Sequence, residues 1–303
     1  MENTRAKTTR NSLILLLTAT IWGMAFVSQS KGMDYMHPFT FNGVRSLIGA
    51  AGILVYILIS RKIAGDKAAK LDWKLNVKAG LLCGIFLTIA STLQQFGIKY
   101  TSVGKAGFIT TLYIIFVPMF GIFLKKKVAP VVWAAAGMAA VGMYLLCMTE
   151  SLRLGAGDIM VFLCAIAFAI QIMTVDHYAA RIDGAVVSCI QFTVCGVVCC
   201  IGALIWGQPT FGQIQEGLGA LLYAGVLSCG VGYTLQIVGQ KGLNPTVAAL
   251  IMSLESVIAT ISGWIAYKIG FLSTDQTLTP RQIAGCVIVF AAVILVQLPQ
   301  EWF

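Results

Sequence analysis

Apolar runs of roughly 20 residues, separated by short polar segments, make up almost the whole chain. A helix of that length crosses about 30 Å of hydrocarbon and satisfies its own backbone polar groups, which lipid cannot do. The pattern therefore predicts an all-α integral membrane protein with ten transmembrane helices. The ten predicted spans are 12–30, 39–60, 76–98, 103–124, 130–148, 158–178, 185–206, 217–239, 245–267 and 280–298.

One stretch of the chain occurs twice. When the sequence is shifted by 142 positions, nine of the thirty residues in Thr92–Gly121 are identical to their counterparts, and chance would give roughly two or three. The matches include Thr92-Leu93-Gln94 on Thr234-Leu235-Gln236. The repeat predicts two halves, residues 1–148 with helices 1–5 and residues 149–303 with helices 6–10, joined at 149–157.

Basic residues between the runs predict the orientation. The longest polar connection, Arg61–Lys74, carries five of them, and Lys and Arg are enriched in cytoplasmic loops. With the N-terminus inside, fourteen Lys and Arg residues fall on the cytoplasmic side and six on the other. An even number of spans keeps both ends together, so both termini are predicted to be cytoplasmic.

The number of spans in each half predicts how the two halves are oriented relative to each other in the membrane. Five is odd, so the two copies are predicted to cross the membrane in opposite directions, as inverted repeats. Inverted repeats occur in many secondary transporters, in which the substrate site lies near the middle of the bilayer between the halves.

Composition supports a membrane protein and argues against nucleic-acid binding, a disulfide framework and a cleaved signal peptide. The chain is 58% hydrophobic and 11% charged, whereas soluble domains are about 25% charged. The net charge of +9 comes from residues that flank the spans, so no nucleic-acid partner is expected. The nine cysteines lie in apolar runs without a CxxC pair and are interpreted as small packing residues. The basic N-terminus resembles a secretory signal, but its apolar run continues through Trp22, which indicates an uncleaved first span.

Several motifs occur in an order typical of one transporter family. They are Thr18-Ala19-Thr20-Ile21-Trp22-Gly23 in the first span, Pro38 followed by Arg45 in the second, and Leu254-Glu255-Ser256-Val257 followed by Gly263-Trp264 in the ninth. With the ten inverted spans, they resemble the drug/metabolite transporter superfamily and in particular its EamA-type members. The resemblance covers nearly the whole chain and implies transport. Members carry amino acids, nucleotide-linked sugars, amines, vitamins and drugs.

Two departures from the family pattern weaken the transfer of any one substrate. Ser256 stands where many members have Pro after the ninth-span Glu. Many members also close spans four and nine with Gly-Glu, where this chain has Lys125-Lys126-Lys127 and Tyr267-Lys268.

Two charged residues lie inside predicted spans. Glu255 is about ten residues into its span, hence near the middle of the bilayer, where a carboxylate is costly and functional by default. We expect it to contact substrate or to exchange a proton; the alternative is a structural carboxylate paired with backbone or with Arg45. Arg45 is predicted to reach the membrane boundary as a structural anchor, with a counter-charge for an anionic substrate group as the alternative.

Polar and aromatic residues at helical spacing predict a central cavity. Thr18, Trp22, Ala25 and Gln29 share one face of the first span, and the sixth span has a matching face around Gln171. Rings with one carboxylate would suit an amine, an amino acid or another cation-bearing solute. The alternative for each Gln or Thr is an interhelical hydrogen bond. The predicted substrate-binding residues are Trp22, Gln29, Gln95, Tyr113, Gln171, Tyr233, Gln236 and Glu255, and Tyr113 and Glu255 are counterparts under the 142 shift.

No enzyme motif supports catalysis. Only His37 and His177 are present, and HExxH, GxSxG, acidic clusters and a P-loop are absent from the sequence, so we expect no metal, cofactor or ATP. The predicted function is a secondary active transporter or exporter in the cell membrane that works by alternating access. The family resemblance implies that helices 1, 3, 4, 6, 8 and 9 line the pathway, and the polar faces agree with this. Its expected partners are a small solute, the bilayer and a coupling proton or cation. The alternatives are a proton-independent facilitator or exchanger and a non-transporting scaffold.

Overall fold

The computed structural model describes residues 2–65, 71–124, 129–147, 155–273 and 275–297. Within these ranges the secondary structure is helical and contains no strand, which confirms the all-α prediction. Eight segments are long and apolar enough to cross a membrane. They are Lys7–Gly32, Pro38–Ala64, Trp73–Ile98, Val103–Phe123, Ala156–Tyr178, Gly184–Gly207, Leu218–Gln240 and Pro245–Lys268.

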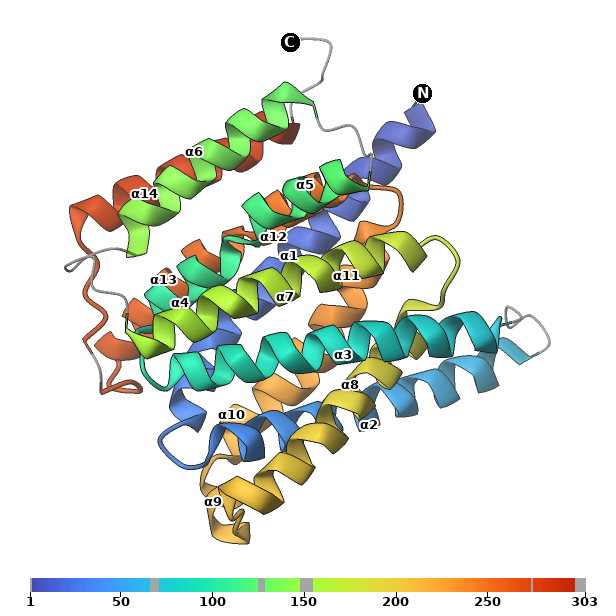
Figure 1. Cartoon of the computed structure of the whole chain (residues 1–303), viewed down its shortest axis with the longest axis vertical. Helices are drawn as coiled ribbons and strands as arrows, with labels where there is room; N and C mark the ends of the chain where they lie inside the picture. The colour runs from blue at the N-terminus through green and yellow to red at the C-terminus, as the bar shows by residue number, and fades with distance from the viewer. Residues whose placement is uncertain (1, 66–70, 125–128, 148–154, 274, 298–303) are drawn as a thin grey trace.

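The described elements follow the predicted order of spans (Figure 1). They are α1 (Glu2–Gly32), α2 (Pro38–Ala64), α3 (Trp73–Ile98), α4 (Val103–Thr111), α5 (Tyr113–Phe123), α6 (Pro130–Cys147), α7 (Ala156–Tyr178), α8 (Gly184–Gly202), π-helical η2 (Ala203–Gly207), α9 (Phe211–Glu216), α10 (Leu218–Leu222), π-helical η3 (Tyr223–Gly232), α11 (Tyr233–Gln240), α12 (Pro245–Met252), α13 (Leu254–Lys268) and α14 (Pro280–Gln297).

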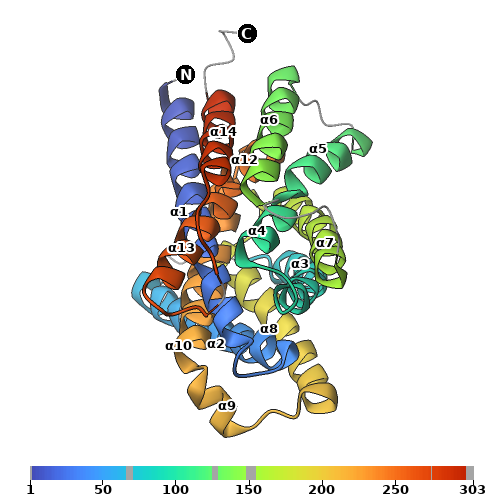
Figure 2. The same ribbon diagram turned by 90° about the vertical axis from the view of Figure 1, so that its left-hand side faces the viewer.

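Two of the ten predicted spans form shorter helices. α6 and α14 each have 18 residues, about 27 Å of helix, and pack against each other beside the remaining helices (Figures 1 and 2). Because they are shorter than the eight long segments, the number of ten spans stays a prediction. The predicted joint between the halves, 149–157, lies largely outside the described residues.

Local sequence explains where several helices begin. Pro38 and Pro245 open α2 and α12, at a position where the missing N–H of proline costs no helical hydrogen bond. Asn244 caps α12 by accepting a hydrogen bond from the Thr246 N–H at 2.9 Å. Asp72 caps α3 in the same way through the Leu75 N–H at 3.0 Å.

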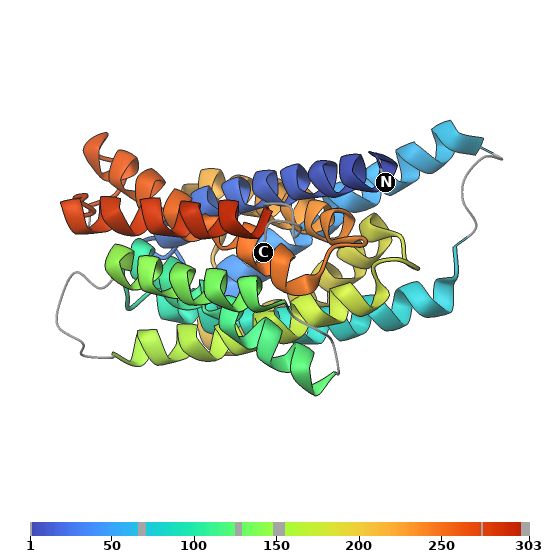
Figure 3. The same cartoon turned by 90° about the horizontal axis from the view of Figure 1, so that it is seen from above.

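Consecutive membrane-length segments run in alternating directions across the molecule (Figures 1 and 3). α2 packs against α8, α3 against α7 and α8, and α1 against α13 and η3. We call the side where α1 begins, at the right of Figure 1, the proximal side, and the opposite side the distal side. α14 ends on the proximal side as well.

Two predicted spans are interrupted near their middles. The fourth breaks at Leu112, between α4 and α5, and the ninth at Ser253, between α12 and α13. Both residues have a ψ closer to zero than a regular α-helix, −10° and −15°, so each tightens the helix for one residue. The spans predicted at 103–124 and 245–267 are thus both present as membrane-length segments, and each is tightened at one residue near its middle. The predicted eighth span likewise contains the π-helical stretch η3.

Candidate functional site

A small cavity lies in the middle of the molecule, bounded by side chains from both halves of the chain. Its volume is about 30 Å³, which holds no more than one or two waters. Pockets that enclose small organic ligands are roughly ten times larger or more. The structure therefore has the lining closed together, and a solute could enter only after helices separate.

Most of the predicted site residues meet at this cavity. Gln95 is the exception: it is buried away from the lining, and its Nε2 donates to the backbone carbonyl of Gln29 at 3.2 Å. The predicted residues that line the cavity are Trp22, Gln29, Tyr113, Gln171, Tyr233, Gln236 and Glu255, together with Arg45.

Glu255 is held by the residue that is its counterpart in the first half. The Tyr113 hydroxyl donates to Glu255 Oε1 at 3.0 Å, and only 4% of Glu255 is exposed. Glu255 is the second residue of α13, two residues after the tightened position Ser253. Glu255 is not paired with Arg45, because the described residues contain no ion pair that includes either of them.

The prediction that Arg45 reaches the membrane boundary is wrong. Arg45 is 5% exposed and lines the cavity, because it lies on the inward face of α2. Its Nε donates to Asn42 Oδ1 at 2.8 Å, and its guanidinium carbon lies 5.4 Å from the centre of the Phe41 ring. No carboxylate among the described residues neutralises it.

Aromatic rings and paired amides complete the wall. The Trp22 and Tyr233 ring centres are 4.5 Å apart, and Trp22 Nε1 donates to the Ser228 carbonyl at 3.4 Å. Gln171 and Gln236 face each other: Nε2 of Gln236 donates to Oε1 of Gln171 at 3.2 Å, and the reverse distance is 3.5 Å. These two glutamines therefore both line the cavity and form a hydrogen bond between helices.

Some lining residues were missed by the sequence interpretation. Gln94 lines the cavity, and its Nε2 donates to Thr110 Oγ1 at 3.2 Å. The repeat could have identified it, because Gln94 is the counterpart of Gln236. Phe26 and Phe168 are counterparts too and also line the cavity, whereas no sequence signal marks Phe192.

The lining is largely built from counterpart positions. Under the 142 shift, six pairs of residues have both members on the cavity wall. They are Phe26 and Phe168, Gln29 and Gln171, Leu87 and Cys229, Ser91 and Tyr233, Gln94 and Gln236, and Tyr113 and Glu255. Tyr113 and Glu255, which are counterparts, also contact each other directly.

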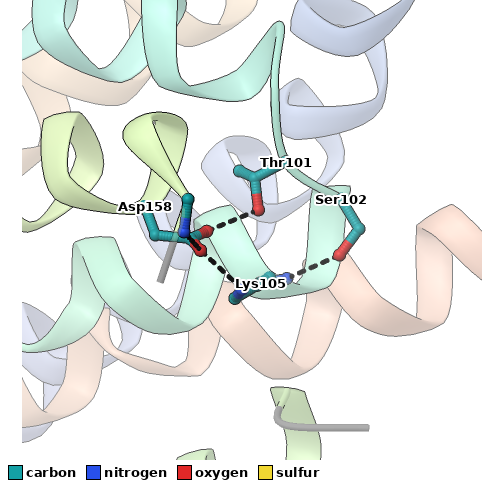
Figure 4. Close-up of polar contacts among 5 residues, drawn as sticks. Thr101, Ser102, Lys105 and Asp158 are labelled. Atoms are coloured by element: carbon teal, nitrogen blue, oxygen red, sulfur yellow. Dashed lines mark hydrogen bonds and ion pairs between the residues drawn. The ribbon is translucent and has the colours of Figure 1, made fainter. Parts of the chain in front are cut away.

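A buried ion pair joins the distal ends of α4 and α7 (Figure 4). Lys105 Nζ donates to Asp158 Oδ2 at 2.6 Å, and the Thr101 hydroxyl donates to Oδ1 at 2.8 Å. The Gly155 N–H also donates to Oδ2, at 2.9 Å. The counterparts of Lys105 and Asp158 are the apolar residues Val247 and Leu16, so this ion pair holds the distal side and has no equivalent on the proximal side.

Known proteins resemble this chain over nearly its full length. The model of the EamA-like transporter family matches residues 10–148 and again 155–298. An uncharacterized transporter of Archaeoglobus fulgidus is 28% identical over 290 residues, covering 94% of this chain and 84% of its own length. The uncharacterized transporter YwfM of Bacillus subtilis is 24% identical, with 94% and 93% covered.

A solved crystal structure has the same fold. It superposes with a TM-score of 0.72 over 95% of this chain and 96% of its own, at 16% sequence identity. At that identity the likeness concerns the arrangement of the helices alone.

Proposed function

Because the chain belongs to the EamA-like transporter family, we propose that it is a secondary transporter that moves a small polar or amphipathic metabolite across the cell membrane by alternating access. The family assignment agrees with the resemblance seen in the motifs. The carrying observation is the central cavity, whose wall holds two opposite charges that are not paired with each other.

We propose that the halves 1–148 and 149–303 are inverted five-helix repeats, with α6 and α14 as the fifth and tenth spans. The six counterpart pairs on the cavity wall support this, as does the direct contact between Tyr113 and Glu255. Counterpart helices also pack together, α2 on α8 and α6 on α14, as expected beside a two-fold axis. Such halves can exchange conformations and open the cavity to either side in turn.

The unpaired charges favour a solute that carries both signs. Arg45 and Glu255 are each about nineteen-twentieths buried, and buried charges are normally paired or bound to a ligand. Oε1 of Gln29 is a further buried acceptor on the wall, and none of the described residues donates a hydrogen bond to it. A zwitterion such as an amino acid would place its carboxylate at Arg45 and its ammonium at Glu255 and Gln29.

A ligand screen followed by transport tests this proposal. Amino acids, amines, nucleobases and vitamins are screened for thermal stabilisation of the purified protein, and hits are assayed in proteoliposomes. We expect Glu255→Gln to weaken binding of a zwitterionic hit about tenfold to hundredfold, as for the loss of a hydrogen bond to a charged group. The N-acetylated form of the same solute has no ammonium group, so its affinity should differ little between the wild-type protein and Glu255→Gln.

Arg45→Gln gives the matched comparison. It should weaken binding of the parent solute and leave the methyl ester, which lacks the carboxylate, nearly unaffected. The unfolding temperature of each variant without solute shows whether it is folded. Transport by Glu255→Gln with unchanged affinity and pH dependence would contradict the role of Glu255. Dependence on a pH gradient would separate proton coupling from facilitated exchange, and absence of transport for every hit would favour a scaffold.

A further inference from the structure

A second cavity opens on the proximal side, away from the central site. Its volume is about 640 Å³, and it lies among the end of α2, the start of α3, the α7–α8 connection and the end of α11. Three cations, Arg61, Arg181 and Lys241, are on its wall. We call it the proximal pocket.

The acidic residues of the proximal pocket are engaged by backbone. Asp72 accepts from the Leu75 N–H at the start of α3, and Asp183 accepts from the N–H groups of Ala185 and Val186 at the start of α8. Neither forms an ion pair with a described cation.

The cations of the proximal pocket form fewer or longer hydrogen bonds than its acidic residues do. Lys241 Nζ donates to the Ile182 carbonyl at 3.3 Å, and Arg181 Nη2 only to the His177 carbonyl at 3.5 Å. Arg61 has no side-chain hydrogen bond or ion pair to another described residue. The pocket therefore offers guanidinium groups to an anion.

The 142 shift indicates why the described side chains leave space here. Three residues of the pocket wall, Ala64, Arg181 and Val238, are the counterparts of Trp206, Phe39 and Phe96. Those three aromatic residues pack together: the Phe39 ring centre is 5.0 Å from that of Phe96 and 5.6 Å from that of Trp206. The three counterpart positions are thus filled by packed rings, whereas in the proximal pocket the same three positions carry Ala64, Val238 and the cation of Arg181.

An apolar groove continues from the proximal pocket along the surface of the helices. It measures about 420 Å³ and lies between α2 and the η3–α11 segment. Tyr56, Thr234 and Val238 belong to both walls, so the groove and the pocket are continuous. Val226 and Val231 on its wall are 43% and 39% exposed. Exposed apolar side chains on a membrane-spanning helix face lipid.

Gly52 forms part of the floor of the groove. A Cβ built on Gly52 would meet no atom within 4 Å. Its counterpart is Val194, and a Cβ on Gly84 would lie 2.9 Å from the Val194 side chain, so the equivalent helices α3 and α8 are tightly packed there. The groove therefore has a glycine at the position where its tightly packed counterpart has Val194.

We propose that the proximal pocket and the groove together bind one anionic phospholipid. Its phosphate lies at Arg61, Arg181 and Lys241, and one acyl chain lies in the groove over Gly52. Guanidinium groups suit phosphate through paired hydrogen bonds, and basic pockets between membrane helices are typical sites for acidic headgroups. The site is separate from the transport cavity and does not depend on the identity of the solute.

The test compares two lipids that differ only in headgroup. The purified full-length protein in neutral detergent is titrated with phosphatidylglycerol or with phosphatidylcholine of the same acyl chains, and the unfolding temperature gives the affinity. We expect phosphatidylglycerol to bind more tightly. Arg61→Gln and Arg181→Gln should each weaken it about fivefold, since a cation near an anionic lipid contributes about 1 kcal/mol.

Two further variants separate the site from general surface charge. Lys78→Gln removes an exposed cation of α3 that is not on the pocket wall and should leave the affinity unchanged. Gly52→Leu fills the groove and should weaken phosphatidylglycerol while the three cations remain. If one of the two arginine variants fails to fold without lipid, the other still tests whether the headgroup binds at the proximal pocket.

Several results would overturn the proposal. Equal affinity for the two lipids would show that the anionic headgroup is not recognised. An equal loss of affinity in Lys78→Gln and Arg181→Gln would show diffuse electrostatic attraction instead of a defined site. The groove would not bind an acyl chain if inorganic phosphate stabilised the protein as much as phosphatidylglycerol does. The same conclusion would follow if Gly52→Leu bound phosphatidylglycerol with unchanged affinity, and either result would contradict a lipid ligand.

Discussion

Gly23 is the residue at which α1 and α13 approach most tightly beside the central cavity. A Cβ at this position would lie 2.7 Å from the backbone oxygen of Glu255 and 2.6 Å from Cβ of Ile258. Real Cβ atoms do not come so close, so any side chain here would push α1 away from α13. Trp22, the preceding residue, would move with it.

We expect Gly23→Ala to lower the free energy of unfolding by about 1–3 kcal/mol, because overpacking forces backbone shifts. Denaturant titration in mixed micelles measures it. Gly137→Ala in α6 is the control: a Cβ there meets nothing within 4 Å, and alanine should stabilise the helix by about 0.5–1 kcal/mol. Equal effects of the two substitutions would show that the α1–α13 contact is not tight.

Gln94 and Gln95 show how far helical spacing predicts a site residue. Both lie in a polar part of α3, and spacing alone favoured Gln95. The structure turns Gln94 toward the cavity and Gln95 toward the backbone of α1. Adjacent residues point about 100° apart around a helix, so the result depends on how α3 is rotated against its neighbours. That rotation is set by packing, which a single sequence does not contain.

At the scale of elements, the sequence predicted where helices lie better than where they are interrupted. Apolar length placed α2 and α3 within a few residues of their observed ends. The breaks at Leu112 and Ser253 have no Gly or Pro of their own, and the π-helical η3 begins at Tyr223 among ordinary apolar residues. These irregularities lie beside the cavity, where contacts between helices override local preference.

The Lys105–Asp158 ion pair makes a prediction about the contact between α4 and α7. Asp158→Asn should weaken closure of the distal side, because it leaves Lys105 without its charge partner in a partly buried setting. With partial exposure of Lys105 taken into account, we expect about 1–3 kcal/mol, or roughly fivefold to hundredfold in the population of the open form. The rate at which a membrane-impermeant thiol reagent labels Gln29→Cys from the distal side measures this opening.

Asp34→Asn is the control for that experiment. Asp34 pairs with Lys31 at 2.9 Å on the same side of the molecule but is 53% exposed, so its loss should change the labelling rate little. Labelling that rises as much with Asp34→Asn as with Asp158→Asn would mean that any loss of acidic charge loosens this side.

At the scale of the whole molecule, the proposed inverted arrangement predicts which connections share a side. Arg61 and Arg181 line one pocket, although they come from different halves. Single cysteines at these two positions should both react from the cytoplasmic side, and one at Lys99, at the distal end of α3, from outside. Reactivity of the Arg61 and Arg181 positions from opposite sides would contradict the inverted topology. If all three positions simply exchanged sides, only the predicted orientation would be wrong.

Under the proposed inverted arrangement, the bond between Tyr113 and Glu255 indicates what two halves in one polypeptide gain over two separate copies. Two identical subunits related by a dyad would bring the same side chain against itself there. Two carboxylates would repel each other, and two phenols would leave no anion for a solute. Once both copies reside in one polypeptide, the partners can differ, and a hydroxyl can meet an acid. In the proposed arrangement, this difference between counterpart positions leaves Glu255 as the one acidic side chain that the described residues place on the cavity wall.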